Sequence, residues 1–378
     1  MNIQTFCFPT SVRFGVGARH EIIEALVDAA LERPLLVIDP GIEQLPPFLS
    51  LVERISERAE ARPFSDFSSQ PDLGAVARGQ KAFSEHRADA IVGIGGGVAL
   101  DMAKAIALLA NNPGALLDYE DGRPDARPVT QPIPWLGAVP TTAGTGSEVG
   151  RSAVISGADG VKHVIFAPEL MPKRVFADPE LLCGLPPGVT AATGMDALTH
   201  CVEAFLAPGF QPLCDGIALR GVTLVARSLK RCVERGDDLE ARADLMAAAL
   251  MGATAFQKGL GVNHSCAHAL GTVCGLHHGL ANGALLPYAM RFNLAASPER
   301  FEELARAAEL EAASGEAFIA WLVALNAELG IPARLRELGV VNTQLDALVS
   351  VALADGCHAT NPRPCDAAGI RSIFEAAL

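Results

Sequence analysis

Short apolar runs alternate with longer segments of helical periodicity through the first half of the chain. The runs PLLVID, AIVGIGGG and WLGAVPTT are apolar at most consecutive positions, at residues 34–39, 90–97 and 135–142. Helical patterns fall between and after the first two runs, at residues 42–58, 72–86 and 99–110. Continuous apolar strands separated by helices are typical of a parallel sheet that is covered on both faces.

The pattern changes after Gly144, where SAVISGADGVKHVIFAP indicates two paired strands that turn around Ala158–Gly160. GLPPGVT at 184–190 then interrupts the chain. Beyond it the periodicity is helical almost to the end, most clearly at residues 209–234, 239–258, 298–310 and 315–329. We therefore predict an α/β domain with a parallel sheet at 1–185 and an all-helical domain at 186–378.

The composition of the chain limits the kinds of partner that the protein can bind. Half of the 378 residues are hydrophobic, and the formal net charge is -13. Such an acidic surface argues against nucleic acid or an anionic membrane as a partner. No apolar run approaches the ~20 residues of a membrane span, and the first residues show no signal peptide. With nine cysteines in no repeating framework, these features predict a cytoplasmic protein with free thiols.

A glycine-rich turn directly follows the apolar run at 90–94. Glycines there, including Gly96 and Gly97, let the backbone approach a phosphate, and the next helix offers its free N–H groups. Alone, this pattern equally fits a tight turn without a ligand. Two other strand ends favour a ligand site. Asp39 could accept a hydrogen bond from a ribose hydroxyl, and PTTAGTGSEVG at 140–150 is rich in hydroxyl groups. Together they predict a dinucleotide site, although Asp39 could instead cap a helix near Ile42.

Carboxylate and imidazole side chains recur in apolar helical segments of the second half. Asp196 and His200 are four residues apart and therefore share a helix face. His264 and His268 repeat this spacing, and LHHG adds two more histidines at 277 and 278. One carboxylate with several imidazoles suits Zn²⁺ or Fe²⁺. A buried Asp–His hydrogen bond, or a histidine acid–base cluster without metal, would also explain parts of the pattern.

These segments carry a resemblance that extends over nearly the whole chain. GGGVALDMAKAIA, PTTAGTGSEV, FADPELLCGLPP, AATGMDALTHCVEAF, GVNHSCAHALG, HHGLANGALLPY and DGCHATNPR occur in the order and spacing found in the iron-containing (group III) alcohol dehydrogenases. The chain resembles that family, whose fold is the dehydroquinate synthase-like one. The resemblance implies a dinucleotide-binding domain followed by a helical metal-binding domain, small alcohol and aldehyde substrates, and a homodimer.

The resemblance also implies roles for individual residues. The ligands of Fe²⁺, or of Zn²⁺, would be Asp196, His200, His264 and His278, which precedes Gly279 at the family spacing. His268 would relay a proton. NAD would contact Asp39, Gly96, Gly97, Thr141, Thr142, Ser147 and Lys162, and also the backbone of Val98, where the family often has serine. An acidic residue at the position of Asp39 accompanies NAD preference. One acid and three neutral imidazoles would give the occupied site a net charge of +1.

Several segments look closest to the branch that contains 4-hydroxybutyrate dehydrogenases, among them GTGSEVGRSAVI and AFQKGLG. Arg151 in the first could bind a substrate carboxylate through a bidentate pair, or could be a surface residue. Maleylacetate reductases share the fold but tend to lack the full ligand set. A dehydroquinate synthase-type lyase would need more basic residues near the metal than Arg151, Lys162 and Lys258.

Overall fold

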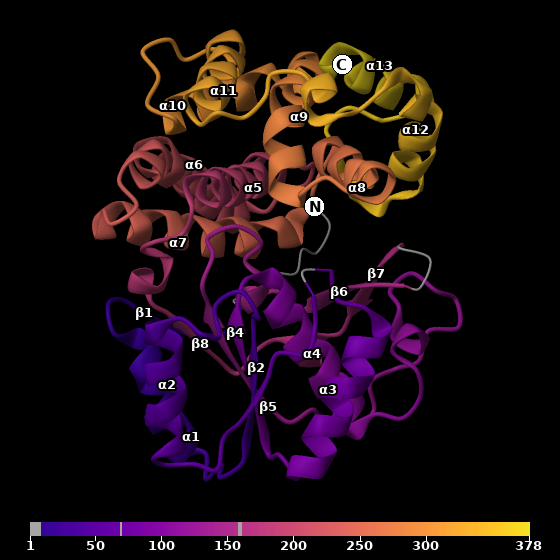
Figure 1. Ribbon diagram of the computed structural model, residues 1–378. Coiled ribbons are helices and arrows are strands. Elements are labelled where there is room, and N and C mark those ends of the chain that lie inside the picture. The colour runs from indigo at the N-terminus through magenta and orange to yellow at the C-terminus, as the bar shows by residue number, and fades with distance from the viewer. Residues whose placement is uncertain (1–8, 69, 158–160) are drawn as a thin grey trace. The chain divides into compact units, whose positions relative to one another are not determined.

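The computed structural model describes residues 9–68, 70–157 and 161–378, which form two compact units (Figure 1). The α/β unit consists of Pro9–Thr142 and Ser147–Leu182. The helical unit contains Ala143–Gly146 and Cys183–Leu378. The α/β class of the first part and the helical class of the second are confirmed, while the domain boundary between 185 and 186 stays a prediction.

A six-stranded sheet is the centre of the α/β unit. All of its pairings are parallel, and the strand order is β1-β8-β5-β4-β2-β3. The strands span β1 Ser11–Phe14, β2 Pro34–Ile38, β3 Arg62–Phe64, β4 Ala90–Gly95, β5 Trp135–Pro140 and β8 Arg174–Ala177. The three predicted strands are therefore the adjacent strands β2, β4 and β5, whereas the other three strands were not predicted.

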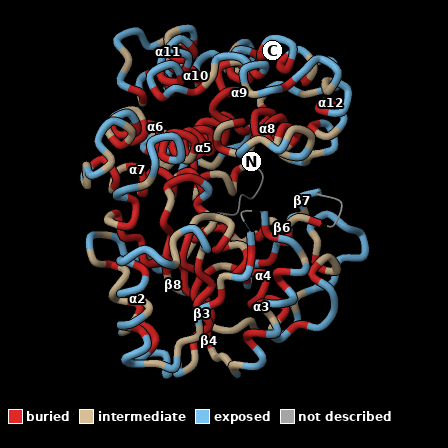
Figure 2. Tube along the Cα trace, viewed as in Figure 1, coloured by how far each residue is buried: buried red, intermediate tan, exposed pale blue. Residues whose placement is uncertain are grey.

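Helices cover both faces of this sheet, as the apolar strands require. Leu35 and Val37 of β2 pack with α3 and α4, whereas Leu36 and Ile38 pack with α1 and α2. Successive residues of a strand point to opposite faces, so every residue of β2 is buried on one side or the other (Figure 2). The helices are α1 Ile22–Asp28, α2 Pro46–Ser56, α3 Leu73–His86 and α4 Gly97–Asn111.

A second, two-stranded sheet pairs β6 Ser152–Ser156 with β7 Lys162–Phe166 in antiparallel register. The pair is the one predicted from the sequence, and its turn around Ala158–Gly160 lies outside the described residues. The helix predicted from residue 42 begins only at Pro46, because residues 39–45 form turns and two prolines occupy the first helical positions.

The helical unit is built around the long buried helix α5 (Figures 1 and 2). Its α-helices are α5 Pro187–Leu206, α6 Pro212–Glu234, α7 Leu239–Ala255, α8 Val262–Cys274, α9 His278–Asn293, α10 Pro298–Ala307, α11 Gly315–Glu328, α12 Leu345–Ala354 and α13 Ala367–Ala377. Helix α5 is buried at almost every position from Thr190 onwards. Each polar side chain on it therefore needs a partner inside the protein.

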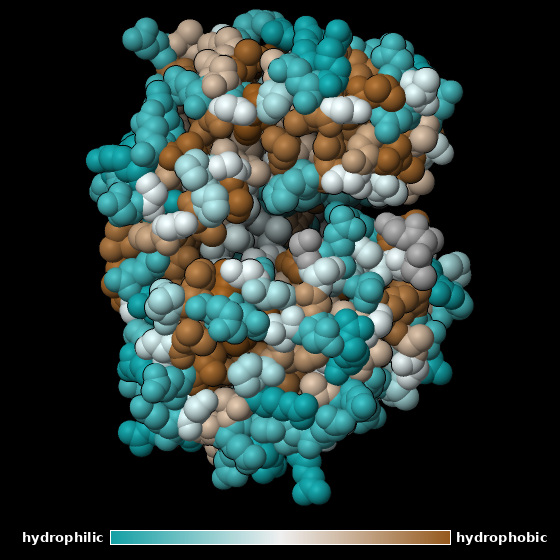
Figure 3. Space-filling view, viewed as in Figure 1, coloured by the Kyte–Doolittle hydropathy of each residue, from teal (hydrophilic) through white to brown (hydrophobic). Residues whose placement is uncertain are grey.

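Among the described residues, no single helix is long and apolar enough to cross a membrane. One bent pair, Leu239–Lys258 with Val262–Cys274, passes the length and composition test together, at an angle of 108°. The face of the molecule in Figure 3 shows hydrophilic residues interspersed with smaller hydrophobic areas, as is normal for a protein surface.

Candidate metal centre

Helix α5 carries three ionisable side chains on one face. Asp196, His200 and Glu203 stand at i, i+4 and i+7, the spacing of a helical stripe. Asp196 and Glu203 are each 2% exposed and His200 is 5% exposed. Burial of unpaired charge would cost several kcal/mol, so this face needs compensating groups from neighbouring helices.

Helices α8 and α9 supply those groups. Donor atoms of Asp196, His200 and His264 all lie within 4.8 Å of one another. The rings of His200 and His264 are stacked, with centroids 4.7 Å apart. His278, at the start of α9, joins through its Nε2, which is 3.3 Å from Asp196 Oδ1. The structure thus brings together all four side chains that the resemblance implies as ligands, whereas the neighbouring His277 is exposed.

Two nitrogens in this cluster test whether a metal fits. His264 Nε2 and His200 Nδ1 are buried, and neither has a hydrogen-bond partner in the described part of the chain. A buried polar atom left unpaired costs about 1–3 kcal/mol. His264 Nε2 faces Asp196 Oδ1 across 3.9 Å, too far for a hydrogen bond but suited to a shared ion. A carboxylate with several imidazoles fits Fe²⁺ or Zn²⁺ equally.

The protonation states of the three histidines and of Asp196 also suit metal binding. Burial lowers the pKa of His200, His264 and His278 to about 4 in each case. All three rings are therefore neutral at pH 7, the form in which imidazole binds a metal. Burial alone would raise the pKa of Asp196, but the neighbouring imidazoles hold it well below its usual range. The cluster presents one carboxylate and three neutral rings.

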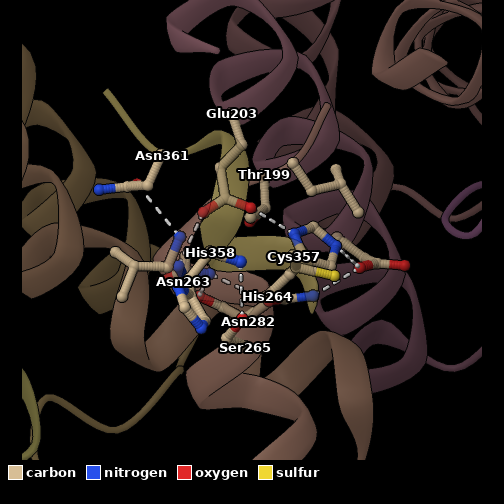
Figure 4. A network of polar contacts seen from close by, with 12 residues as sticks. Thr199, Glu203, Asn263, His264, Ser265, Asn282, Cys357, His358 and Asn361 are labelled. Carbon is tan, nitrogen blue, oxygen red and sulfur yellow. Dashed lines mark hydrogen bonds and ion pairs between the residues drawn. The ribbon is translucent and has the colours of Figure 1, made fainter. Parts of the chain in front are cut away.

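Two buried asparagines connect the cluster and escaped the sequence analysis. Asn282 lies one turn after His278 on α9; its Nδ2 donates to Asp196 Oδ1 at 2.7 Å and lies 3.1 Å from His278 Nε2. Asn263 Nδ2 donates in turn to Asn282 Oδ1 at 3.0 Å (Figure 4). The sequence feature that could have identified Asn282 was its i+4 spacing from His278. Polar residues at this spacing also occur on helices without a functional site, so the feature is not specific.

Glu203 also escaped the sequence analysis. Its Oε2 accepts from His264 Nδ1 at 2.5 Å (Figure 4), and burial raises the pKa of this carboxyl to about 7. The expected net charge of +1 counted only the four ligands. A second carboxylate in contact with a ligand means that the count of charges must include Glu203.

His268 lies beside the cluster. Its ring stacks on that of His278 with centroids 5.1 Å apart, and its Nδ1 is 2.7 Å from Asp355 Oδ2. The other oxygen of Asp355 accepts from Ser265 Oγ at 2.7 Å and from Cys357 N at 2.8 Å. His268, Asp355 and Cys357 could themselves approach a metal, but these three hydrogen bonds already satisfy the carboxylate.

In the α/β unit, the ends of β2, β4 and β5 meet as predicted. Asp39 N donates to Ile94 O, and Thr141 N donates to Gly95 O, each at 3.0 Å. Gly95 has φ +150°, and a Cβ there would lie 2.7 Å from Asp39 Cβ. Asp39 Oδ1 accepts from Gly41 N at 2.8 Å, and α2 starts too late for Asp39 to cap it. This carboxylate belongs to the turn at the strand end.

The remaining predicted cofactor residues divide into two sets. Gly96 is the N-cap of α4, and Gly97 and Val98 are its first residues; a Cβ on Gly96 would lie 3.3 Å from Thr142, so the turn packs closely against the end of β5. Lys162 is exposed at the start of β7.

Ser147 differs from these residues because its hydroxyl is already engaged. It donates to Asp101 Oδ1 at 2.6 Å and accepts from the buried Lys104 at 2.8 Å. Lys104 Nζ also donates to Ser152 O at 2.8 Å. The network ties α4 to the loop that leads into β6.

Comparison with known proteins agrees with this arrangement. Residues 9–179 match the model of the iron-containing alcohol dehydrogenases, and residues 190–378 match that of the C-terminal part of the Fe-containing alcohol dehydrogenase family. The chain is 39% identical to 4-hydroxybutyrate dehydrogenase of Cupriavidus necator, over 98% of each chain.

Two solved structures are similar over their whole length. A 1,3-propanediol oxidoreductase superposes with a TM-score of 0.95 at 34% identity, covering 99% of this chain and 100% of the other. Sulfoacetaldehyde reductase from Bifidobacterium kashiwanohense, in complex with NAD⁺, superposes with a TM-score of 0.92 at 27% identity, covering 100% and 99%. The chain therefore belongs to the iron-containing alcohol dehydrogenase family.

Proposed function

We propose that the protein is an NAD-dependent, Fe²⁺-containing dehydrogenase that interconverts a short ω-hydroxy acid, such as 4-hydroxybutyrate, and its semialdehyde. The observation that carries the proposal is the buried cluster of Asp196, His200, His264 and His278, with ring nitrogens that lack protein partners. The 39% identity to a 4-hydroxybutyrate dehydrogenase supports the choice of substrate.

Different residues of the chain would bind the metal, bind the nucleotide and transfer the proton. A divalent cation at the cluster would stabilise negative charge on the substrate oxygen, and a nicotinamide would accept the hydride. The four side chains would hold the ion; those of Asp196, His200 and His264 are buried, and that of His278 is 25% exposed. Asp39 and the glycine-rich turn before α4 would hold the nucleotide at the sheet edge. His268, 31% exposed, is placed to carry the hydroxyl proton from the site towards solvent.

Asp355 positions His268 in this scheme, because it accepts the Nδ1 proton and leaves Nε2 as the free base. In Asp355→Asn, the oxygen stays with Ser265 and Cys357, so the amide NH₂ faces Nδ1 and forces the other tautomer. We expect kcat to fall about tenfold or more, with metal content unchanged.

The His268→Ala background tests that assignment. Asp355→Asn should cost little there, because its effect runs through the imidazole. Asp366→Asn, which changes the N-cap of α13, is the matched control and should keep wild-type kcat. Equal kcat in Asp355→Asn and wild type would refute the assignment.

Arg151 is the candidate for recognising the substrate carboxylate. Its guanidinium lies 5.2 Å from the centre of the Phe166 ring, and no carboxylate of the described residues forms an ion pair with it. A stacked arginine without an acidic partner keeps its bidentate face available for an anion. Its position just before β6 is fixed by the hydrogen bond from Ala167 N to Arg151 O at 3.1 Å.

Arg151→Gln should therefore raise the KM for 4-hydroxybutyrate by about 10- to 100-fold. The neutral butane-1,4-diol should be oxidised by the variant with kcat/KM within about twofold of wild type, because it has no carboxylate for Arg151 to bind. Steady-state kinetics on both substrates measure the difference. Arg123→Gln, which alters an exposed arginine paired with Asp125, is the control. Equal losses on the acid and the diol would remove Arg151 from substrate recognition.

An anaerobic assay tests the proposed function as a whole. The apo protein is reconstituted with Fe²⁺ or Zn²⁺, and NADH formation is followed with short alcohols, diols and ω-hydroxy acids. We expect activity only with metal, and the highest kcat/KM with an ω-hydroxy acid. Metal-independent turnover of maleylacetate, or no NADH with any alcohol, would contradict the proposal.

A further inference from the structure

The buried carboxylate of Glu203 contacts the metal cluster without belonging to its ligand set. Its side chain is 1% exposed, and its Oε2 lies 2.5 Å from His264 Nδ1. It extends the Asp196–His200 stripe of α5 by one further turn. Figure 4 shows Glu203 and His264 facing one another across this contact. The question is what a second acid contributes at this depth.

The N-terminus of α8 holds Glu203 in place. Asn263 N donates to Glu203 Oε1 at 2.7 Å, and the N-cap residue is Gly261, which offers no side chain. A Cβ on Gly261 would lie 2.6 Å from the same oxygen. Free N–H groups and the positive end of the dipole stabilise an anion at a helix start. The carboxylate is thus fixed by backbone, and its second oxygen is aimed at His264.

This contact selects one tautomer of His264. A ring that donates from Nδ1 to a carboxylate carries its proton there and presents a lone pair at Nε2. That Nε2 is buried without a hydrogen-bond partner among the described residues, and it lies 3.9 Å from Asp196 Oδ1. The proton is therefore directed away from the cluster, and the lone pair into it.

We propose that Glu203 is a positioning residue for the metal: it fixes the tautomer and orientation of His264. The inference rests on the proposed metal centre.

Glu203→Gln tests the assignment with little change of shape. A glutamine has one oxygen and one NH₂ group, so it cannot accept from both Asn263 N and His264 Nδ1. With its oxygen on Asn263 N, its NH₂ faces Nδ1 and drives the ring proton to Nε2, where a metal should bind. We expect the affinity of the anaerobic apo protein for Zn²⁺, measured by competition with a chelator, to fall about 10- to 100-fold.

Three controls separate this role from a structural one. The metal-free Glu203→Gln protein should keep a cooperative thermal transition. Glu148→Gln, which alters a buried carboxylate of the α/β unit, should bind Zn²⁺ with wild-type affinity. The His264→Ala protein should not retain metal through purification, but its weak residual Zn²⁺ binding can be measured by direct titration at high Zn²⁺ concentration. In that background, adding Glu203→Gln should change the residual affinity less than about twofold, because the ring through which Glu203 acts is gone.

The outcomes are distinct. Wild-type Zn²⁺ affinity in Glu203→Gln, or an undiminished loss in the His264→Ala background, overturns the inference and leaves the proposed function standing. A wild-type protein that binds no Zn²⁺ overturns both. Weakened binding confined to proteins that retain His264 supports the positioning role.

Discussion

Replacing His264 with alanine is expected to abolish both metal retention and turnover. Its Nε2 is one of two ring nitrogens of the cluster that are buried without a hydrogen-bond partner in the described part of the chain, and it faces Asp196 Oδ1. Loss of one ligand opens the site to water, and loss of the ion removes several kcal/mol of charge stabilisation. We expect kcat to fall at least about a thousandfold. Metal analysis of anaerobically purified protein and steady-state kinetics provide the two measurements.

His277→Ala is the matched control, because this exposed histidine directly precedes His278 in the chain. It should retain the ion and normal kcat. Asp196→Ala should reproduce the loss seen with His264→Ala. Full activity in a metal-stripped His264→Ala protein would show that the cluster serves another purpose.

Replacing Asp39 with glycine is expected to shift cofactor use from NAD towards NADP. The carboxylate stands at the end of β2 with one oxygen engaged by Gly41 N. The other oxygen would accept a bond from the ribose hydroxyl of NAD and repel the phosphate of NADP. Removing the carboxylate would abolish both the hydrogen bond to NAD and the repulsion of NADP. Because contacts between like charges cost several kcal/mol, the gain for NADP should be large. The ratio of kcat/KM for NADP to that for NAD should rise about 100-fold.

Asp39→Asn sharpens this experiment, because asparagine keeps the acceptor for Gly41 N and removes only the charge. It should move the ratio in the same direction. Asp66→Gly alters an exposed aspartate that pairs with Arg78 in the same unit, and its ratio should match wild type. A ratio unchanged in both Asp39 variants would exclude Asp39 from the ribose site.

The core of the arrangement could be predicted because it obeys strong local rules. Strands β2, β4 and β5 are buried on both faces and therefore read as continuous apolar runs. Asp196 and His200 stand out in the sequence because burying a carboxylate and an imidazole in an apolar helix is costly unless they have partners. Strands β1 and β3 gave no such signal, since β1 is largely exposed at the sheet edge and β3 has only three residues.

The outer contacts could not be predicted, because they depend on how three helices pack. Glu203 follows Asp196 at a helical interval, yet a glutamate on a helix is usually solvated. Only the approach of α8, permitted by Gly261, turns it into the partner of His264. Asp355 lies ninety residues after Ser265 in sequence separation, and no periodicity relates them. Tertiary packing, rather than local pattern, makes these pairs.

All four proposed ligands come from α5, α8 and α9, whereas the strand ends proposed for the nucleotide precede them in the chain. Because synthesis runs from the N-terminus, the ribosome would release the nucleotide-binding strands before His278 even exists. A metal ion could therefore complete its full ligand set only after the start of α9 has been synthesised.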